Sequence, residues 1–460
     1  MSNSKIIIIG AGPGGYVAGI RAAQLEADVT IIEENQIGGT CLNRGCIPTK
    51  SLLASTEALL LVRRASELGI EVGEAVPNFS RMMERKNRIV SGLRGGVDYL
   101  LKANKIKVIK GKAGFLDSHK IHIETDTGTQ KLEGEKIIIA SGSKPLLLPF
   151  IDFDHSAVLT SEEALKLKEI PKSLLIIGAG VIGCEFASIF NPLGTKITMV
   201  EMMDQILPTE DKRIVQVMQQ VLQKRGINIF TKTKLEEIIE YREDSITARF
   251  DNGEEVTTEK ILISVGREAN TEGLGLENLL LRVDGKGNII VNEKMETNLE
   301  GIYAIGDVVG GYLLAHVAFE EGIVAAENAL GIDSKIDYTS VPNCIFTSPQ
   351  IGTVGLTLDK AKEEIEAKLA RFPFAASGKA QAMGEAEGLL QLIVEEDSGR
   401  ILGGQIIGPH AADLIHEIAL AVRWGLTTEQ VASTIHAHPT FSEAIMEVAK
   451  KAEGKPIHLT

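Results

Sequence analysis

Two cysteines are the side chains of this 460-residue sequence best suited to redox chemistry. Cys41 and Cys46 lie close together in the segment from Gly38 to Lys50. Two neighbouring thiols can close into a disulfide, and a disulfide exchanges two electrons when it opens. The alternative is a pair of buried or zinc-binding thiols, but a zinc site needs a second ligand pair at short spacing and none accompanies these residues. We therefore interpret Cys41 and Cys46 as a redox pair.

The spacing of this pair predicts an irregular backbone. Five residues of ideal helix rise about 7.5 Å, whereas a disulfide joins Cα atoms about 4.4 to 6.8 Å apart. The segment must therefore bend if the cysteines bond, and Gly45 and Pro48 are the sources of irregularity that the sequence offers. Cys184 and Cys344 lie in apolar surroundings and are interpreted as inert core thiols.

A second cluster near the chain end offers acid/base chemistry. Dithiol exchange needs a base because only the thiolate attacks a disulfide, and a histidine matches that task. The segment from His436 to Glu443 contains two histidines, and spacing alone does not choose between His436 and His438. Glu443 either orients the histidine or completes a helix capping box that begins at Thr440.

These groups must be positioned by the elements before them, where the sequence repeats itself. Residues 5–33 align with residues 173–201 at a constant offset of 168 positions. In each copy an apolar run precedes a glycine turn and a helix, and a second apolar run ends in an acidic residue, Glu33 or Glu201. This is the form of a dinucleotide-binding βαβ unit.

The glycines of both turns have distinct tasks in such a unit. The first makes the tight turn, the second lets the backbone approach a pyrophosphate, and the third lets the helix pack against the strand. The acidic residue accepts hydrogen bonds from ribose hydroxyls and repels a 2′-phosphate. Because Met202 and Met203 follow Glu201 in place of an arginine, the second unit is predicted to prefer NAD over NADP. The glycines are Gly10, Gly12 and Gly15 in the first unit and Gly178, Gly180 and Gly183 in the second.

The rest of the chain extends these units. Residues 51–107 are predicted to be largely helical, and strands are expected at 121–123, 136–140 and 261–265. The run from Ile302 to Asp307 is predicted to be a buried strand with an acid at its end, and the chain from about Asp337 to form a separate unit.

Composition restricts the partners. The net charge of −14 argues against nucleic-acid binding, which requires a basic surface. No apolar run approaches the roughly 20 residues that cross a bilayer. The N-terminal residues lack the features of an export signal, so a cytoplasmic location is expected.

Four segments together resemble the pyridine nucleotide-disulfide oxidoreductases, and the resemblance covers essentially the whole chain. They are residues 39–50, 305–307, 374–378 and 436–443. The resemblance implies an α/β fold with two Rossmann-like domains, which bind FAD and NAD, and a C-terminal α+β dimerisation domain. The implied boundaries are 1–142 for the FAD domain, 143–266 for the NAD domain, 267–335 for a return to the FAD domain and 336–460 for the dimer interface.

The resemblance also assigns roles to residues. Glu33 would bind the adenosine ribose of FAD, Asp307 its ribityl chain, and Lys50 would lie near the flavin and pair with Glu185. The homodimer would bring His438, oriented by Glu443, to the other subunit's Cys41 and Cys46. Further cofactor contacts are expected at Gly114, Gly142, Gly266 and Ala315.

Within this family the resemblance is strongest to members that oxidise protein-bound dihydrolipoamide. It implies that a dihydrolipoyl thiol loses its proton to His438 and attacks Cys41, and that Cys46 passes the electrons through FAD to NAD⁺. The partner would be the lipoyl domain of a 2-oxoacid dehydrogenase complex or the lipoyl carrier protein of glycine cleavage. Alternatives are a glutathione- or mercuric-reductase-like enzyme, disfavoured by Glu201, and a redox-sensing flavoprotein, disfavoured by the intact cysteine and His/Glu clusters.

Overall fold

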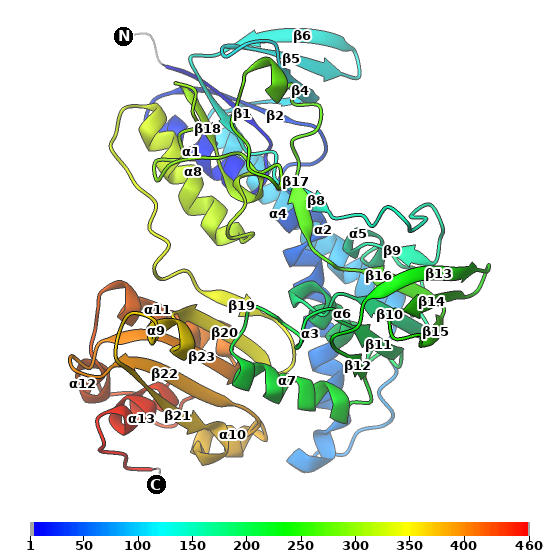
Figure 1. The fold of residues 1–460 in the computed structure, drawn as a ribbon, viewed down its shortest axis with the longest axis vertical. Coiled ribbons are helices and arrows are strands. Elements are labelled where there is room, and N and C mark those ends of the chain that lie inside the picture. The colour runs from blue at the N-terminus through cyan, green and yellow to red at the C-terminus, as the bar shows by residue number, and fades with distance from the viewer. Residues whose placement is uncertain (1–3, 459–460) are drawn as a thin grey trace.

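The computed structural model describes residues 4–458 and contains three five-stranded sheets, each with its own helices (Figure 1). Two sheets are parallel and the third is antiparallel. The predicted fold class, two Rossmann-like units followed by an α+β unit, is therefore confirmed.

The first parallel sheet has the strand order β18-β7-β1-β2-β3. Its central strand is the apolar run of the first glycine unit and is buried from Ile6 onward, as expected for a parallel sheet covered on both faces. Helices α1 and α8 lie side by side on one face (Figure 1). The elements are β1 (Lys5–Ile9), α1 (Pro13–Gln24), β2 (Asp28–Glu33), β3 (Lys107–Lys110), β7 (Lys136–Ile139), β18 (Ile302–Ala304) and α8 (Ala315–Ala329).

A long insertion between β2 and β3 contains the cysteine segment. It consists of α2 (Gly39–Arg44), α3 (Cys46–Arg63), the short 3-10 helix η1 (Ala65–Leu68) and α4 (Phe79–Ala103). The helical prediction for residues 51–107 is confirmed in its main part. A small antiparallel sheet follows, formed by β4 (Lys112–Phe115), β5 (Lys120–Thr125) and β6 (Gly128–Glu133).

The second parallel sheet repeats the arrangement of the first. Its strand order is β12-β11-β10-β16-β9. Lys5 pairs with Asp28 in the first sheet and Ser173 pairs with Lys196 in the second, so the register obeys the same offset of 168 positions. The elements are β9 (Val158–Leu159), α5 (Ser161–Ala164), β10 (Ser173–Ile177), α6 (Val181–Phe190), β11 (Lys196–Val200), α7 (Lys212–Lys224), β12 (Asn228–Phe230), β13 (Leu235–Tyr241), β14 (Ile246–Phe250), β15 (Glu255–Thr258) and β16 (Lys260–Ile263).

Two crossings of the chain connect these sheets. The strands β8 (Ser143–Pro145) and β17 (Arg267–Ala269) pair antiparallel between them. After β17 the chain passes η2 (Leu276–Asn278), enters β18 at the edge of the first sheet and turns at η3 (Gly306–Val309) into α8.

The antiparallel sheet of the C-terminal unit has the order β19-β20-β23-β22-β21. A separate core lies between this sheet and the helices α11 and α13. Its elements are β19 (Asn343–Ile345), β20 (Gln350–Gly355), α9 (Leu358–Ala361), β21 (Ala367–Pro373), η4 (Phe374–Ala376), α10 (Gly378–Met383), β22 (Leu389–Glu395), β23 (Ile401–Gly408), α11 (Ala411–Arg423), α12 (Thr428–Ser433) and α13 (Glu443–Ala452).

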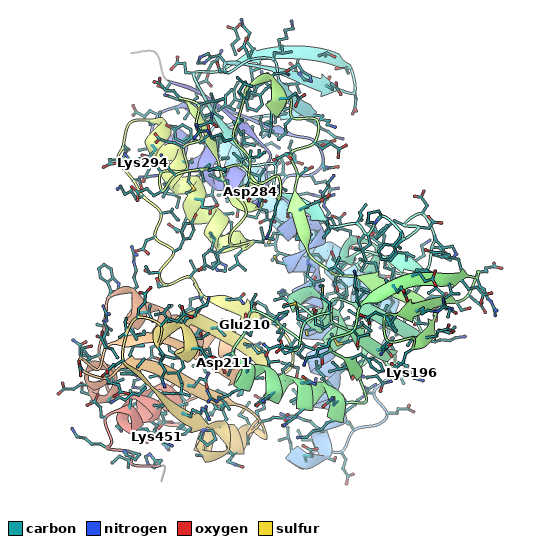
Figure 2. The ribbon with its side chains drawn as sticks, in the orientation of Figure 1. Lys196, Glu210, Asp211, Asp284, Lys294 and Lys451 are labelled. Atoms are coloured by element: carbon teal, nitrogen blue, oxygen red, sulfur yellow. The ribbon has the colours of Figure 1, made fainter. Side chains whose placement is uncertain are left out.

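The C-terminal unit contacts the second parallel sheet through buried polar groups. Figure 2 shows Glu210 and Asp211 where α7 approaches β19 and β20. Asn343 donates a 2.7 Å hydrogen bond from Nδ2 to Oε1 of Glu210. Burial raises the pKa of Glu210, although hydrogen bonds from Thr353 and Asn343 oppose that shift. No helix of residues 4–458 has the length and apolar character needed to cross a membrane.

Candidate active site

A cavity of about 2260 Å³ joins both glycine turns, the cysteine segment and the C-terminal unit. Its size exceeds that of an ordinary small-molecule pocket, about 300 to 1,000 Å³. The predicted site residues that line it are Gly10, Gly12, Glu33, Cys41, Cys46, Lys50, Gly142, Gly178, Gly180, Glu185, Glu201, Gly266, Asp307 and Ala315. The cavity is therefore continuous from one nucleotide-binding turn to the other.

The two glycine turns have the same backbone conformation. Gly10 has φ of 103° and Gly178 has φ of 94°, values that favour glycine. The third glycine of each turn permits close packing, because a Cβ on Gly15 would lie 2.0 Å from Gly10 O and one on Gly183 would lie 2.2 Å from Gly178 O. Gly15 and Gly183 do not line the cavity and instead hold helix against strand, as the sequence predicts.

Glu33 and Glu201 end their second strands in the same way. Oε2 of Glu33 accepts the Ala11 N–H at 2.7 Å, and Oε2 of Glu201 accepts the Ala179 N–H at 2.9 Å. Their Oε1 atoms accept the N–H of Asn35 and of Met203. Both carboxylates are thus fixed at the cavity wall beside a glycine turn.

The first turns of α1 and α6 suit a pyrophosphate. Gly12 and Gly180 precede these helices without a side-chain cap, and the first turn of each helix contains no acidic residue. Their free N–H groups and positive helix ends therefore remain available to an anion. Together with the carboxylate at each turn, these features fit two dinucleotides, one at each end of the cavity.

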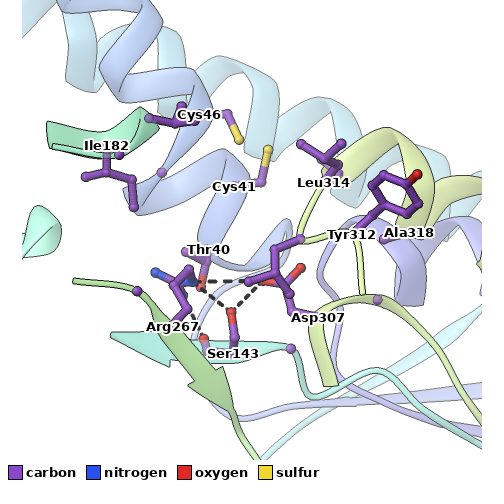
Figure 3. Close-up of a pocket in the computed structure, with 18 of the residues that line it drawn as sticks. Thr40, Cys41, Cys46, Ser143, Ile182, Arg267, Asp307, Tyr312, Leu314 and Ala318 are labelled. Carbon is purple, nitrogen blue, oxygen red and sulfur yellow. Dashed lines mark hydrogen bonds and ion pairs between the residues drawn. The ribbon is translucent and has the colours of Figure 1, made fainter. Parts of the chain in front are cut away.

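The cysteine pair lies where two helices meet. Helix α2 ends at Arg44 and α3 begins at Cys46, and Gly45 between them has non-helical angles, φ −138° and ψ −112°. The expected bend is therefore present at Gly45. Pro48 lies in the first turn of α3, where its missing N–H removes no helical hydrogen bond. The two sulfur atoms point toward one another (Figure 3).

The environment shifts the pKa values of the two thiols in opposite directions. The hydrogen bond from Cys41 is the main cause that lowers the pKa of Cys46 to about 7; burial opposes the shift and the Lys50 ammonium supports it. The same contact, together with burial, raises the pKa of Cys41. In the reduced pair Cys46 therefore loses its proton before Cys41 does.

Lys50 connects the cysteine helix to α6. Its Nζ lies 2.8 Å from both carboxylate oxygens of Glu185, as the resemblance implied. The Glu185 side chain is 5% exposed, and Phe346 of the C-terminal unit contacts both partners. The Phe346 N–H donates to Glu185 at 3.0 Å, and its ring centroid lies 4.7 Å from Lys50 Nζ. Three units of the chain thus meet at this ion pair.

Asp307 belongs to a polar cluster at the opposite cavity wall (Figure 3). Its carboxylate accepts a hydrogen bond from the hydroxyl of Ser143. Arg267 donates to the Ser143 hydroxyl at 2.7 Å and to the Ser143 carbonyl at 2.8 Å. The crossing strands β8 and β17 therefore hold the acid of η3 in place.

A buried carboxylate supports the turn that contains Asp307. Glu321 of α8 accepts the Gly306 N–H at 2.6 Å and the Tyr338 hydroxyl at 2.7 Å. Burial raises the pKa of Glu321 to about 7, and the nearby Asp307 adds to the shift. Glu321 joins the turn to the segment that leads into the C-terminal unit.

The two histidines near the chain end differ in exposure and in bonding. His438 Nδ1 lies 2.8 Å from Glu443 Oε1, its side chain is 78% exposed, and no hydrogen bond in the described chain occupies its Nε2. His436 is 6% exposed, with Nδ1 2.8 Å from Thr434 O and Nε2 2.8 Å from Glu417 Oε1. The structure therefore favours His438 over His436 as the accessible base.

Glu443 contacts both the His438 ring and the Thr440 backbone. Its Oε2 accepts the Thr440 N–H at 2.8 Å while Oε1 faces His438. A full capping box is not formed, because the Thr440 hydroxyl donates to Ala437 O and α13 begins only at Glu443. Neither His438 nor Glu443 lines the cavity of the same chain.

Gly114 lies elsewhere than the sequence predicts. Gly114 does not line the cavity, whereas its neighbours Lys112 and Ala113 do. A Cβ on Gly114 would lie 2.3 Å from the His122 ring, so this glycine accommodates the β4–β5 pairing. The sequence does not predict the residues that contact Asp307, its turn or Glu185, which are Ser143, Arg267, Glu321, Tyr338 and Phe346. The only local signal was Arg267, directly after Gly266 at the end of the second unit.

Family models match nearly all of the chain. The model described as pyridine nucleotide-disulphide oxidoreductase matches residues 4–322, and the model described as its dimerisation domain matches residues 341–449. A dihydrolipoyl dehydrogenase of Bacillus subtilis is 44% identical, with 98% of each chain covered. Proteins of the same name from Geobacillus stearothermophilus and Halobacterium salinarum are 41% and 40% identical over 99% of this chain, covering 97% and 98% of their own lengths.

Solved structures show the same fold. LpdA from Mycobacterium tuberculosis superimposes with a TM-score of 0.92 at 28% identity, covering 97% of this chain and 99% of that one. The HOCl-induced flavoprotein disulfide reductase RclA from Escherichia coli gives a TM-score of 0.87, also at 28% identity, with 97% and 99% covered.

Proposed function

We propose, since this chain belongs to the pyridine nucleotide-disulphide oxidoreductase family, that it is a dihydrolipoyl dehydrogenase that reduces NAD⁺. The observation that carries the proposal is the Cys41/Cys46 pair, whose sulfur atoms face one another in a cavity shared with two dinucleotide-binding turns. The relatives named dihydrolipoyl dehydrogenase support the choice of substrate.

The two cofactors are assigned to the two turns. The first turn with Glu33, together with Gly142, Asp307 and Ala315, would hold FAD, and the second with Glu201 and Gly266 would hold NAD. This assignment divides the chain into an FAD domain (1–142), an NAD domain (143–266), a return to the FAD domain (267–335) and an interface domain (336–460). When bound, FAD supplies an acceptor for two electrons and NAD⁺ an acceptor for hydride.

The side chains then have defined tasks in thiol exchange. Nε2 of His438 takes a proton from one dihydrolipoyl thiol, and Glu443 holds the ring through Nδ1. The resulting thiolate attacks Sγ of Cys41, the Cys41–Cys46 bond breaks, and Cys46 leaves as the thiolate that its environment favours. The second dihydrolipoyl thiol then attacks the mixed disulfide, which closes lipoamide and releases Cys41, and the proton of that thiol passes to the departing Cys41 sulfur.

A homodimer completes this arrangement. His438 and Glu443 lie on the C-terminal unit and outside their own chain's cavity, so the partner subunit's His438 is assigned to Cys41. The dimerisation-domain match over residues 341–449 supports this assignment. The lipoyl partner is a lipoyl domain of a 2-oxoacid dehydrogenase complex or the glycine-cleavage carrier, and the expected location is the cytoplasm, where thiols stay reduced.

The test is turnover of dihydrolipoamide with NAD⁺ by the purified flavoprotein. We expect NADH to form only when dihydrolipoamide is present. In Cys46→Ser this reaction should vanish while FAD stays bound. Cys344→Ser, which removes a thiol outside the pair, should retain most of the activity. Turnover of glutathione disulfide with NADPH in place of dihydrolipoamide with NAD⁺ would contradict the proposal, as would flavin loss in Cys46→Ser.

A further inference from the structure

The segment that holds His438 is tied to the rest of the C-terminal unit by a second histidine. Residues 434–442 connect α12 to α13. Most hydrogen bonds of this segment are local, such as those of Thr440 with Ala437 and Glu443. Within residues 4–458, the side-chain bond of His436 to Glu417 on α11 is the one that leaves this neighbourhood.

Both ring nitrogens of His436 contact oxygen atoms. Nδ1 faces the Thr434 carbonyl and Nε2 faces the Glu417 carboxylate, each at 2.8 Å. The ring therefore bridges the backbone of its own segment and a side chain of α11.

The His436 side chain is buried, whereas the His438 side chain is exposed. The ring is 6% exposed, whereas His438, two residues later, is 78% exposed. Glu443 fixes the rotation of the His438 ring from the first residue of α13. That contact does not involve α11, which the segment reaches through the hydrogen bond of His436 to Glu417.

We infer that His436 and Glu417 are positioning residues, which hold the His438 segment against α11 so that Nε2 of His438 meets the thiol pair of the partner subunit. This inference rests on the proposed function and adds two residues to it. A displacement of about 1 Å at a reacting group can cost about 100-fold in rate. Loss of the tie should therefore act on the proton-transfer step and leave cofactor binding intact.

The test compares two reactions of the full-length, FAD-loaded dimer. In His436→Ala and Glu417→Ala we expect dihydrolipoamide turnover to fall about 10- to 100-fold. Reduction of ferricyanide by NADH requires bound FAD and NADH but no deprotonation of a thiol by His438. The rate of this reaction should stay within twofold of the wild-type rate. The double variant should be no worse than either single variant, because both remove the same bond.

Two further variants separate positioning from a general loss of folding. Glu417→Gln can donate its amide to Nε2 of a neutral His436 and should recover most of the turnover. In a His438→Gln background, His436→Ala should cause no additional loss, since the group that it positions is already absent. Matched exposed controls are His119→Ala and Glu429→Ala, for which unchanged turnover is expected.

Three outcomes would overturn the inference. They are near wild-type turnover in His436→Ala, a parallel fall of the ferricyanide reaction, and a further large loss in the His438→Gln background. Failure of the proposed function itself would be seen separately, as absence of dihydrolipoamide turnover in the wild-type protein.

Discussion

The ammonium of Lys50 lies 2.8 Å from both carboxylate oxygens of Glu185, and the two groups act in opposite directions on the same thiol. Beyond the hydrogen bond from Cys41 and the effect of burial, Lys50 lowers the pKa of Cys46 and Glu185 raises it. The ion pair thus adjusts the pKa of Cys46, which the hydrogen bond from Cys41 mainly lowers.

Removing the positive or the negative charge of this pair should shift the pKa of Cys46 in opposite directions. Lys50→Met removes an attractive charge and should raise the pKa of Cys46 above about 7, whereas Glu185→Gln should lower it. The measurement is the pH dependence of thiolate ultraviolet absorbance in the reduced protein, with Cys46→Ser identifying the signal. Shifts of both variants in the same direction would contradict the electrostatic interpretation.

Glu201 is predicted to control the choice of nicotinamide nucleotide. A lost hydrogen bond to a charged group costs about 1.5 to 3 kcal/mol, so Glu201→Ala should raise KM for NAD⁺ roughly 10- to 100-fold. Because repulsion of a 2′-phosphate also disappears, the preference for NAD⁺ over NADP⁺ should shrink. Steady-state kinetics with both nucleotides provide the check. The matched variant Glu33→Ala should instead weaken FAD retention, and equal effects of both variants on NAD⁺ would refute the assignment.

Glu443→Gln should impair the base without unfolding α13. Although burial disfavours the carboxylate, the Thr440 N–H and the His438 ring lower the pKa of Glu443 and keep it ionised. A glutamine amide that donates to Nδ1 would leave the proton of His438 on Nε2, where the thiol proton must arrive. Dihydrolipoamide turnover should fall roughly 100- to 10,000-fold, the usual contribution of a general base. Circular dichroism should be unchanged, and a turnover above a tenth of wild type would argue against this role.

Glu321 should make the folded state less stable as pH rises. Its pKa is raised to about 7 in the folded chain from an ordinary value of 4.5, so the folded state retains the proton longer than the unfolded state. Stability from this group is full below the unfolded value and declines up to about pH 7. Glu321→Gln keeps both contacts and removes the titration.

Melting temperatures at pH 5 and pH 8 test this sign. Relative to the wild type, Glu321→Gln should be more stable at pH 8 than at pH 5. Glu429→Gln, at an exposed position on α12, should show no such change. A wild-type protein that gains stability from this group as pH rises would show that Glu321 is ionised at a lower pH than its burial indicates.

Local sequence was sufficient to predict those parts of the site that depend on residues close together along the chain. The glycine turns, Glu33 and Glu201 follow from short-range backbone demands, and the bend at Gly45 follows from the geometry of a disulfide. The choice of His438 over His436 depends on which ring contacts Glu417, a residue on another helix, and no spacing rule encodes that contact. The same holds for Phe346 and Tyr338, which reach the site from a different unit.

Gly114 is a residue whose role the sequence alone does not determine. A glycine in a strand is compatible with a ligand approaching the backbone or with a bulky cross-strand neighbour, and the sequence does not distinguish these. Here the neighbour is His122, and the cavity wall is formed by Lys112 and Ala113. Packing across strands is sufficient to explain the glycine.

The separation of His438 from its own chain's cavity has a genetic consequence. If each catalytic centre combines the cysteines of one copy with the histidine of the other, two differently damaged alleles can rescue one another. A dimer assembled from a Cys41→Ser copy and a His438→Gln copy would contain one centre with both lesions and one with neither. Co-expression of two inactive forms would then restore part of the activity that each lacks alone.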